Sequence, residues 1–586
     1  MIRYSVGISK VPFSENGLKV LESESQVGDN NFDNWPVVYI IDDGARKYAY
    51  VGETTNIQRR LEQHFKNPVR KGLTRAHIIH DHSFNKSVIL DLEAFLINFM
   101  HADGLYQLQN GNGGQHCHNY YDRESYQAVF KEIWKDLKEK GLAKEDVSTI
   151  ENSDLFKYSP YKTLTNDQYR IAEEVVKTLA ADLNANRRST CFIRGGAGTG
   201  KSILGVFLAK LLVDSQDELG WDTEDDDLEQ NLSRIAAQLH GVKKLKIAYV
   251  VPMQGFRKTM KKVFKHVKGL RPGMVLSPTD VANSDESYDI LIVDEAHRLR
   301  RRVGLSSYIG FDDKNRKLGL GHDGDELDWI RSKSTYQILF YDRSQSIKPA
   351  DIKPEKFEKL RTAVSTHIYE LHSQLRCLGG DDYLDFIGKM LTCNAEAWVE
   401  KKDYQLKLFE DVEDMFDAIR IQEKDCTLCR MIAGFAWEWE TKGYDYETIK
   451  VSNLYDIDIE GHHYIWNTTD KDWINSRHSI DEIGCIHTTQ GFDLNYAGVI
   501  IGPELDYDPV GNRLVVYRSR YKDVMGKVKT GSGDGLKEYV LNIYKTLLAR
   551  GVRGTYIYAC NPNLRAYLST LIPVVRHGGS DIEQDE

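Results

Sequence analysis

The sequence has few cysteines and no long hydrophobic run. Its eight cysteines are scattered over 586 residues, which is typical of a protein in a reducing cytosol and argues against a disulfide-bonded scaffold. The longest apolar segments, residues 290–293 and 499–501, have the length of strands, which argues against a membrane-spanning helix. The first residues, MIRYSVGISK, lack the apolar core of a secretion signal. We therefore expect a cytoplasmic protein without a membrane partner.

Charge of one sign does not dominate the sequence either. The composition, 41% hydrophobic and 28% charged, is that of a globular protein, and the length suits three or four domains. Much of the net charge of −10 is local, because acidic residues gather at 214–229 and at the C-terminal end. Basic residues gather at 257–268 and at 298–302. The net charge therefore does not exclude a nucleic-acid partner.

The segment GGAGTGKS is the strongest signal in the sequence. It lies between a short apolar run and a helical pattern, which predicts the order strand, loop, helix. Glycines let backbone N–H groups turn toward phosphates, while the lysine reaches the β- and γ-phosphates and the serine binds Mg²⁺. Eight fitting positions favour this interpretation over an ordinary glycine-rich turn. We expect ATP or GTP binding and hydrolysis through Gly195, Gly196, Ala197, Gly198, Thr199, Gly200, Lys201 and Ser202.

Two later apolar runs end in polar side chains. The segment DILIVDEAH predicts a buried parallel strand that ends in two carboxylates, and open α/β sheets bind ligands at this edge. Asp294 is expected to hold Mg²⁺ through water, and Glu295 to orient the water that attacks the γ-phosphate. The segment YQILFYDRSQ predicts a third such strand, which places Gln345 as a sensor of the γ-phosphate.

The first hundred residues predict a small ββα unit. Residues 37–41 and 48–52 have the pattern of a hairpin, and residues 55–65 have helical spacing. Tyrosines packed in a plain core would explain the pattern. The spacing, however, resembles that of the GIY-YIG nuclease family over roughly the first 110 residues. The matching positions are the tripeptides Val38-Tyr39-Ile40 and Tyr50-Val51-Gly52, followed by Arg60, His64, Glu93 and Asn110.

This resemblance implies an endonuclease that cuts a phosphodiester. Glu93 would be the single carboxylate that holds Mg²⁺, and Arg60 would stabilise the charge of the phosphorane. Tyr39, Tyr50 and His64 would share water activation and proton relay, and His77 is a weaker candidate. The glycine of the first tripeptide is absent. Glu53 stands where some members of the family carry lysine, which leaves the water-activating group open.

From residue 164 onward, the motif order resembles the Schlafen-like branch of superfamily 1 helicases in prokaryotes. Gln168 is placed both to close a capping box with Thr165 and to read adenine, and both roles can hold. The resemblance implies that arginines from a second lobe reach the γ-phosphate and that an H-x-x-Q-G motif lies beside it. These later positions are Arg376, Gln490, Gly491 and Arg550. Cys426 and Cys429 are interpreted as part of a helical apolar stripe in the core.

The predicted fold class is a multidomain α/β protein. A small α+β GIY-YIG domain is expected over 1–145, a linker over 146–162, and RecA-like parallel-sheet domains over 163–375 and 376–586. An insertion is expected in the second of these at about 395–475. Its tryptophans could stack bases, although core packing is the preferred interpretation. They are Trp437, Trp439, Trp466 and Trp473.

These signals together predict an ATP-dependent, Mg²⁺-dependent helicase or translocase that is joined to an endonuclease. Family context favours defence against phage or other foreign DNA, with DNA preferred to RNA as the substrate. A second copy of the chain or another component of a defence system is the expected protein partner. One alternative is a nucleotide-switched sensor whose ATPase controls the nuclease without moving along a strand. A small-molecule kinase is disfavoured by Gln490 and the second lobe.

Overall fold

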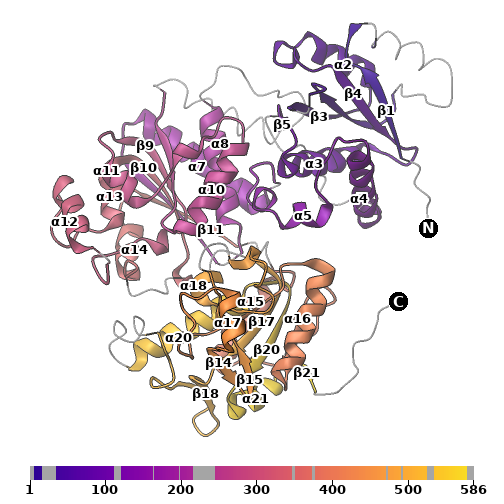
Figure 1. Ribbon diagram of the computed structural model, residues 1–586. Helices are drawn as coiled ribbons and strands as arrows, with labels where there is room; N and C mark the ends of the chain where they lie inside the picture. Colours follow the sequence, from indigo (N-terminus) through magenta and orange to yellow (C-terminus); the bar gives the residue numbers. More distant parts are fainter. Residues whose placement is uncertain are drawn as a thin grey trace. The chain divides into compact units, whose positions relative to one another are not determined.

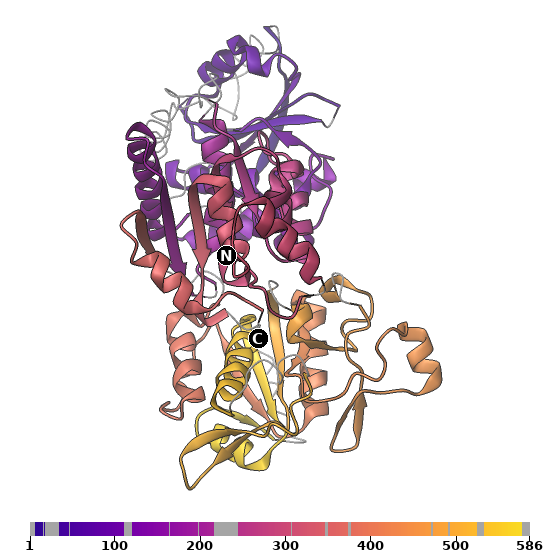
Figure 2. The same ribbon diagram turned by 90° about the vertical axis from the view of Figure 1, so that its left-hand side faces the viewer.

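We describe the fold from a computed structural model, drawn in Figure 1 and, turned by 90°, in Figure 2. One mostly antiparallel sheet and two parallel sheets organise the described part of the chain. The predicted fold class, a small α+β domain followed by parallel-sheet domains, is therefore confirmed. The structure describes residues 6–15, 17, 34–45, 47–110, 120–162, 164–196, 198–215, 244–305, 307–345, 350–372, 377–469, 473–489, 493–523 and 533–576.

The first sheet is built around the predicted hairpin, whose strands β2 and β3 are buried. Their β-branched and aromatic residues favour extended backbone. Tyr39 lies opposite Gly52 and Ile41 lies opposite Tyr50, so that the two tyrosines lie on the same face of the sheet. The strand order is β1-β4-β2-β3-β5, and β5 is the parallel member. The strands are β1 (Gly7–Pro12), β2 (Val37–Asp42), β3 (Tyr48–Thr54), β4 (Arg75–His80) and β5 (Gln107–Leu108).

Asparagine side chains cap the two helices that pack against this sheet. Asn56 begins α2 (Ile57–Lys66), and Asn85 begins α3 (Lys86–Asp103), where each side chain accepts a hydrogen bond from the first turn. α3 ends at Gly104, whose φ of 67° is the left-handed conformation that favours glycine. The helices that follow are η1 (Pro68–Arg70), α4 (Arg123–Glu139), α5 (Val147–Asn152) and α6 (Asp154–Lys157).

The first parallel sheet has the strand order β11-β6-β10-β9-β7-β8. Its central strands are buried almost throughout, as expected for strands covered on both faces. β6 and β9 both pair in parallel with β10, so that their carboxyl ends meet at one edge of the sheet. The strands are β6 (Ser189–Gly195), β7 (Ile247–Val250), β8 (Val275–Leu276), β9 (Tyr288–Val293), β10 (Ser334–Tyr341) and β11 (Thr366–Leu371).

The helices that alternate with these strands begin at recognisable signals. Thr165 and Gln168 form the predicted capping box at the start of the first of them. The second helix begins directly at Lys201, after the glycine-rich loop. The helices are α7 (Asn166–Asn184), α8 (Lys201–Asp214), α10 (Gln254–His266), η3 (Pro272–Met274), α11 (Pro278–Asn283), η4 (Ala296–Arg298), α12 (Tyr308–Lys317), α13 (Glu326–Lys333), η5 (Arg343–Gln345) and α14 (Pro354–Arg361).

The second parallel sheet has the strand order β16-β13-β17-β20-β12-β21, and its pairings are parallel. The sheet strands are β12 (Gln405–Phe409), β13 (Arg430–Ala433), β16 (Ile483–Cys485), β17 (Leu494–Ile501), β20 (Gly551–Ala559) and β21 (Val574–Val575). The accompanying helices are α15 (Gly380–Leu391), α16 (Val412–Cys426), α17 (Tyr446–Ser452), η6 (Trp473–Asn475), α18 (Ile486–Thr489), α20 (Gly533–Leu548) and α21 (Pro562–Ser569). Two hairpins stand apart from the sheet, β14 (Ile457–Ile459) with β15 (His462–Tyr464), and β18 (Leu505–Asp508) with β19 (Arg513–Val516).

The expected insertion at 395–475 differs from the observed fold. β12 and β13 both come from this range and pair within the second parallel sheet, so the range supplies part of the sheet itself. Only the part that carries α17 and the β14–β15 hairpin, orange in Figure 2, extends to one side of the sheet. Trp466 and Trp473 are buried, which confirms the preferred interpretation of core packing over base stacking for these two residues.

The chain divides into two compact units, each made of segments that are separate in the sequence. One comprises Met1–Arg187, Ser202–Tyr249 and Lys258–Val275, and the other comprises Arg188–Lys201, Val250–Arg257 and Leu276–Glu586. Two short helices, α5 and α6, occupy much of the expected linker at 146–162. Within the described ranges, no helix combines the length and the apolar character that crossing a bilayer requires.

Candidate functional sites

The predicted nuclease residues meet on the face of the first sheet that α2 covers. Tyr39 Oη and His64 Nε2 are 2.8 Å apart and buried. The ring of Tyr50 lies 4.7 Å from the imidazole of His64 and 6.3 Å from the ring of Tyr39. The hairpin register and one helix thus bring together the three residues expected to relay a proton.

The charges of Arg60 and Glu93 act on the hydroxyl of Tyr39 in opposite directions. Burial raises the pKa of Tyr39 well above its usual value, and the nearby phenol of Tyr50 and carboxylate of Glu93 act in the same direction. The guanidinium of Arg60 donates a hydrogen bond to Tyr39 and acts in the opposite direction. Glu93 reaches the group from α3 and is half-exposed, so that its carboxylate can meet solvent.

Asn110 contacts the backbone of β3. Its Oδ1 accepts a hydrogen bond from Val51 N at 3.1 Å, and its Nδ2 donates to Val51 O at 2.8 Å. The amide therefore pairs with β3 as a neighbouring strand would, next to Tyr50. This contact makes Asn110 a positioning residue that holds the strand on which Tyr50 lies.

Arg70 is a buried residue of this site that sequence reasoning missed. Its guanidinium lies 3.6 Å from the centre of the Tyr50 ring, and its Nε donates to His64 Nδ1 at 3.5 Å. Burial, and then the charges of Arg70 and Arg60, lower the pKa of His64 to about 3. His64 is therefore neutral near pH 7, and its Nε2 carries the proton that it shares with Tyr39. In the sequence, the signal that could have identified Arg70 is its basic side chain six positions after His64.

Gly52 and His77 occupy opposite faces of the sheet. A Cβ at Gly52 would lie 2.3 Å from Tyr39 Oη, which explains why this tripeptide ends in glycine. His77 lies opposite Ile40, on the face away from Tyr39, and contacts the buried carboxylate of Asp42 at 2.9 Å. This contact gives the weaker candidate, His77, a structural role.

Glu53, the departure from the family pattern, is buried and paired. Its carboxylate accepts a hydrogen bond from the ammonium of Lys86 at the start of α3. The residue that sequence comparison identified as a departure therefore has a lysine partner from another element. Only the tertiary structure brings Lys86 to this position, 33 residues further along the chain.

The glycine-rich loop has the geometry of a phosphate cradle. Gly198 and Gly200 have φ of 82° and 74°, which other residues rarely adopt, and a Cβ at Gly195 would lie 2.5 Å from Thr199 Oγ1. The ammonium of Lys201 donates to Gly195 O at 2.8 Å and to Gly196 O at 2.6 Å. The lysine is thus buried within the turn of the loop. Ser202 is the next residue of α8 and is half-exposed.

The two carboxylates after β9 differ in their surroundings. Asp294 is fully buried, and its Oδ1 accepts a hydrogen bond from Glu295 N at 2.9 Å. Glu295 has a left-handed backbone with φ of 53°, a strained conformation that clusters at functional sites. Burial disfavours its charge, but His297, Lys201 and Arg298 outweigh burial and lower the pKa of Glu295 to about 2.

His297 and Asp342 join the ends of β9 and β10. His297 Nε2 lies 2.8 Å from Glu295 Oε2, and its Nδ1 accepts a hydrogen bond from Asp342 N at 3.3 Å. The carboxylate of Asp342 accepts a hydrogen bond from Gln345 Nε2 at 2.6 Å and lies 3.6 Å from Lys201 Nζ. The predicted Lys201, Glu295 and Gln345 are therefore linked by His297 and Asp342, neither of which was expected as a site residue.

For the other predicted residues of the helicase part, the structure shows only local contacts. Gln168 is buried, and its Oε1 accepts from Thr165 N in the capping box. Arg550 is buried after α20, and its carbonyl accepts from Leu494 N at 3.1 Å. Their roles at the nucleotide remain predictions. Four predicted residues lie outside the described part of the chain, and they are Ala197, Arg376, Gln490 and Gly491.

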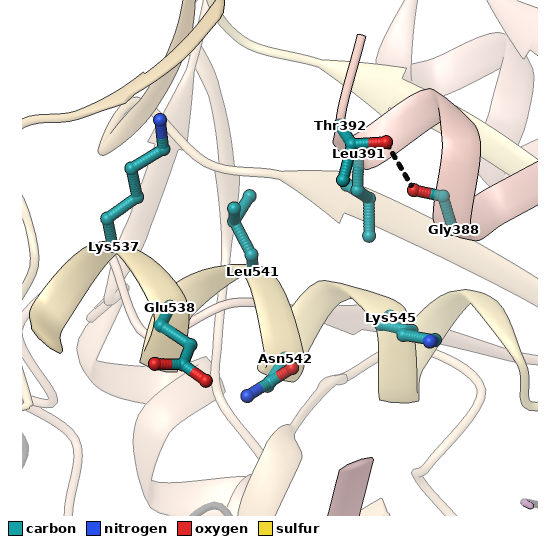
Figure 3. Close-up of a pocket in the computed structure, with 8 residues that line it drawn as sticks. All are labelled: Gly388, Leu391, Thr392, Lys537, Glu538, Leu541, Asn542 and Lys545. Atoms are coloured by element: carbon teal, nitrogen blue, oxygen red, sulfur yellow. Dashed lines mark hydrogen bonds between the residues drawn. The ribbon is translucent and has the colours of Figure 1, made fainter. Parts of the chain in front are cut away.

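A cavity of about 330 Å³ lies between α15 and α20 (Figure 3). The apolar side chains of Leu391 and Leu541 line it, together with the charged residues Lys537, Glu538 and Lys545 of α20. It contains none of the residues predicted for catalysis or nucleotide binding.

Comparison with known proteins found a sequence relative and several structural neighbours. The chain is 25% identical to the uncharacterized protein YPL245W of Saccharomyces cerevisiae over 442 residues, which cover 69% of this chain and 90% of the yeast protein. Among solved structures, Bacteroides Pif1 bound to ssDNA is 9% identical with a TM-score of 0.26, and 70% of this chain and 95% of that chain are covered. A structure of two coordinating Pif1 helicases at forked dsDNA is 12% identical, with the same TM-score and coverage.

Two families match separate parts of the sequence. Residues 36–99 match the GIY-YIG catalytic domain, which contains all the predicted nuclease residues except Asn110. Residues 188–561 match the Schlafen group 3, DNA/RNA helicase domain. This second match covers more than half of the chain and includes the glycine-rich loop, Glu295 and Arg550. The chain therefore belongs to the Schlafen group 3 helicase family and, with its GIY-YIG catalytic domain, is a helicase–nuclease that hydrolyses ATP and cuts phosphodiesters.

Proposed function

We propose that the chain is an ATP-dependent nucleic-acid translocase or helicase that delivers a strand, DNA in preference to RNA, to its own Mg²⁺-dependent endonuclease. Defence against phage or other foreign DNA is the proposed role. We assign the nuclease to residues 1–145 and the two halves of the motor to 163–375 and 376–586. The observation that carries the proposal is the convergence of two separate sets of catalytic side chains in one polypeptide.

ATP fits the first set of residues. The loop accepts only glycine at several positions, so its backbone can approach phosphates closely, and Lys201 lies within it. Ser202 and Asp294 are oxygen donors of the kind that Mg²⁺ prefers. Glu295 stays ionised at neutral pH and lies 2.8 Å from His297, which suits a carboxylate that accepts a hydrogen bond from the attacking water and orients it. When bound, the metal neutralises the charge of the phosphates.

The remaining predicted residues would complete the nucleotide site. We propose that Gln168 contacts the base and that Gln345 senses the γ-phosphate beside Asp342. The proposal assigns Gln490 and Gly491 to the same site. Its last element is a pair of arginines, Arg376 and Arg550, which the second half of the motor would donate.

A divalent cation also fits the nuclease site. Glu93 is a half-exposed carboxylate beside Tyr39, and Mg²⁺ commonly uses one carboxylate together with several waters. The metal, when bound, would polarise the scissile phosphate. Arg60 is always protonated and would stabilise negative charge on the phosphorane. The Nε2–H group of neutral His64 would donate a hydrogen bond to the Tyr39 oxygen. The hydroxyl proton of Tyr39 could then point to an oxygen of the scissile phosphate or of the attacking water.

A basic helix face supports a nucleic-acid partner. α10 buries Met260, Val263 and Phe264, and its opposite side carries exposed lysines. Lysines on one helix face can neutralise a phosphate backbone without reading its sequence. Those on α10 are Lys258, Lys261, Lys262 and Lys265. Arg257 is not part of this face, because its guanidinium donates to Val251 O at 2.7 Å.

An ATPase assay with single-stranded DNA, duplex DNA and RNA tests the proposal. DNA is expected to stimulate hydrolysis, and Lys201→Ala is expected to abolish it while leaving cleavage chemistry intact. Glu93→Gln is expected to abolish cleavage and leave ATP hydrolysis unchanged. Hydrolysis that no nucleic acid stimulates would instead favour a nucleotide-switched sensor. Plaque counts on a bacterial host that expresses the wild type or Glu93→Gln would test the defence role.

A further inference from the structure

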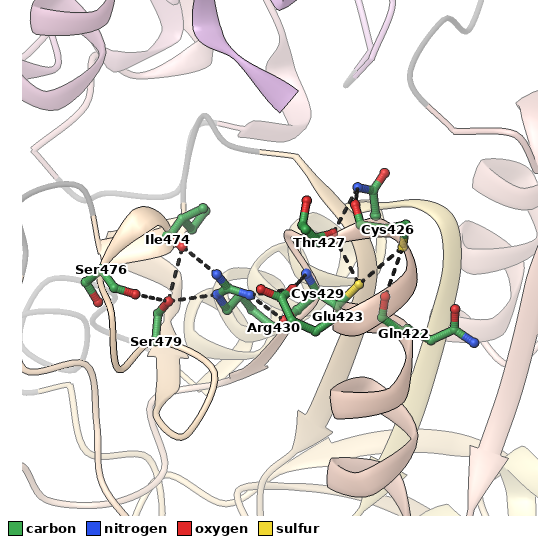
Figure 4. Close-up of polar contacts among 10 residues, drawn as sticks. Gln422, Glu423, Cys426, Thr427, Cys429, Arg430, Ile474, Ser476 and Ser479 are labelled. Atoms are coloured by element: carbon green, nitrogen blue, oxygen red, sulfur yellow. Dashed lines mark hydrogen bonds and ion pairs between the residues drawn. The ribbon is translucent and has the colours of Figure 1, made fainter. Parts of the chain in front are cut away.

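The loop between α16 and β13 brings two cysteine sulfurs together (Figure 4). α16 ends at Cys426, and Cys429 directly precedes β13, so the expected helical stripe is wrong at this point. The helix stops because Thr427 and Leu428 have φ of 56° and 49°. The Sγ atoms of Cys426 and Cys429 are 3.6 Å apart.

The loop is held in this conformation by specific contacts. Two consecutive residues other than glycine with a positive φ are costly, and such strain persists only where the surroundings enforce it. Glu423 Oε2 accepts a hydrogen bond from Cys429 N at 2.7 Å. Asn495 Nδ2 donates to the carbonyls of Cys426 and Thr427, at 2.8 and 2.9 Å. The fold therefore holds a strained backbone in the conformation that juxtaposes the sulfurs.

The two thiols differ in access and in proton affinity. Cys426 is half-exposed, whereas Cys429 is fully buried. Either thiol can donate to the other, and each also has a carbonyl acceptor, Gln422 O for Cys426 and Thr427 O for Cys429. The contact between the sulfurs lowers the pKa of Cys426 and raises that of Cys429. An accessible sulfur with thiolate character beside a second cysteine is the usual arrangement of a redox-sensing pair.

We propose that Cys426 and Cys429 are a modification site that forms a reversible disulfide when the protein meets a hydroperoxide. The Cys426 thiolate attacks the terminal oxygen of the peroxide, so that an S–O bond forms and the O–O bond breaks. The other oxygen leaves as hydroxide, or as alkoxide from an organic hydroperoxide, and takes up the proton that the Cys426 thiol released. The Cys429 sulfur then attacks the Cys426 sulfur, so that an S–S bond forms and the S–O bond breaks, and the hydroxyl leaves with the Cys429 proton as water. The two sulfurs lose two electrons, which reduce the peroxide.

The folded structure favours the second step. A disulfide needs its sulfurs about 2.05 Å apart, so each sulfur moves by less than about 1 Å from the observed separation. Because this attack is intramolecular, the burial of Cys429 does not prevent it. Cytosolic disulfides are uncommon and, where present, are typically transient and redox-sensing.

The site also contacts the start of β17, which is hydrogen-bonded to Arg550. Asn495, whose amide holds the loop, follows Leu494, and Leu494 N donates to Arg550 O at 3.1 Å. A disulfide that shifts the carbonyls of the loop would therefore move the backbone of the proposed arginine finger. We expect oxidation to slow ATP hydrolysis at least twofold, an effect that rests on the proposed function.

Peptide mass measurement tests the modification itself. Trypsin cleavage after Lys424 and Arg430 releases DCTLCR, which contains both cysteines of the site and no others. After treatment of the full chain with hydrogen peroxide, this peptide is expected to lose two hydrogens and to regain them with dithiothreitol. Sulfinic or sulfonic acid on Cys426 with a free Cys429 thiol would overturn the proposal, as would an unmodified peptide.

Cysteine variants separate the roles of the two thiols. In Cys429→Ser, Cys426 is expected to accumulate a sulfenic acid that dimedone traps, because its resolving partner is gone. In Cys426→Ser, the buried Cys429 is expected to stay unreacted. Equal dimedone labelling of the two variants would contradict this assignment. Cys393→Ser, which removes another half-exposed thiol, is the matched control and is expected to leave the disulfide unchanged.

The effect on ATP hydrolysis is measured in the same samples. The slower rate is expected in the oxidised wild type and in Cys393→Ser, and not in Cys426→Ser. A normal rate despite a complete disulfide would overturn the coupling to Arg550. If the reduced wild type shows no ATPase activity, the proposed function fails, whereas the disulfide measurement still decides the modification site.

Discussion

Gly52 gives a direct test of how the nuclease site is built. A Cβ at this position would lie 2.3 Å from Tyr39 Oη and 2.4 Å from Tyr39 Cζ. Atoms in van der Waals contact stay about 3.5 Å apart, so Gly52→Ala must displace the tyrosine ring or the strand by about 1 Å. The displaced atom is the one that lies 2.8 Å from His64 Nε2. We therefore expect this substitution to break the Tyr39–His64 hydrogen bond.

The expected loss of activity is large. A misplacement of about 1 Å can cost about 100-fold in rate, and 100-fold corresponds to about 2.7 kcal/mol of transition-state stabilisation. Overpacking in the core should also destabilise the nuclease domain by about 1–3 kcal/mol. The rate is measured as kcat/KM for cleavage of an end-labelled DNA, with ATP hydrolysis as the control for folding of the motor.

A second glycine of the same domain provides the matched control. A Cβ at Gly72 would meet no atom within 4 Å, so Gly72→Ala should cleave at the wild-type rate. Adding Tyr39→Ala to Gly52→Ala should recover part of the lost thermal stability, because the clash disappears, but should not restore cleavage. Cleavage by Gly52→Ala within twofold of the wild-type rate would refute the proposed geometry of the site.

The charged and polar contacts give four further predictions. His297→Ala should lower the rate of ATP hydrolysis at least tenfold. It should also move the acid limb of the pH–rate profile to higher pH, because Glu295 loses a partner that lowers its pKa. An unchanged pH–rate profile would count against this role of His297. Arg70→Gln should raise the pKa of His64 and add an acid limb to the cleavage profile, because a neighbouring positive charge is removed. In the wild type, the pKa of His64 is 6.5 in the unfolded chain and about 3 in the folded chain, so the unfolded chain takes up a proton first as the pH falls. The free energy of unfolding should therefore fall as the pH falls from 6.5 to about 3, which melting curves at different pH values would show. Asn110→Ala removes two buried hydrogen bonds to β3 and should destabilise the nuclease domain by about 2 kcal/mol, measured by denaturant unfolding, with the ATPase unaffected.

The motifs were visible in the sequence because their chemistry depends on short, local spacings. A strand, a glycine-rich loop and a helix are consecutive in the chain, so GGAGTGKS predicts a phosphate site without knowledge of distant contacts. The spacing of Tyr39, Tyr50, Arg60 and His64 likewise depends on one hairpin and the helix after it. The fold class followed from the same local patterns.

The partners of those residues were decided only by the tertiary structure. Arg70 reaches Tyr50 and His64 through the packing of a short 3-10 helix, which has no periodic signal in the sequence. His297 and Asp342 meet because β9 and β10 are neighbours in a parallel sheet, although 45 residues separate them in the chain.

The cysteine pair and the supposed insertion show the same limit. Apolar spacing suggested a helix through Cys426 and Cys429, whereas contacts from Asn495 and Glu423 stabilise a strained turn between them. β12 and β13 belong to the second parallel sheet, although the sequence predicts an insertion over their range. Local propensity determined which segments could be strands, loops or helices, and long-range packing decided which side chains share a site, because such contacts depend on the whole fold.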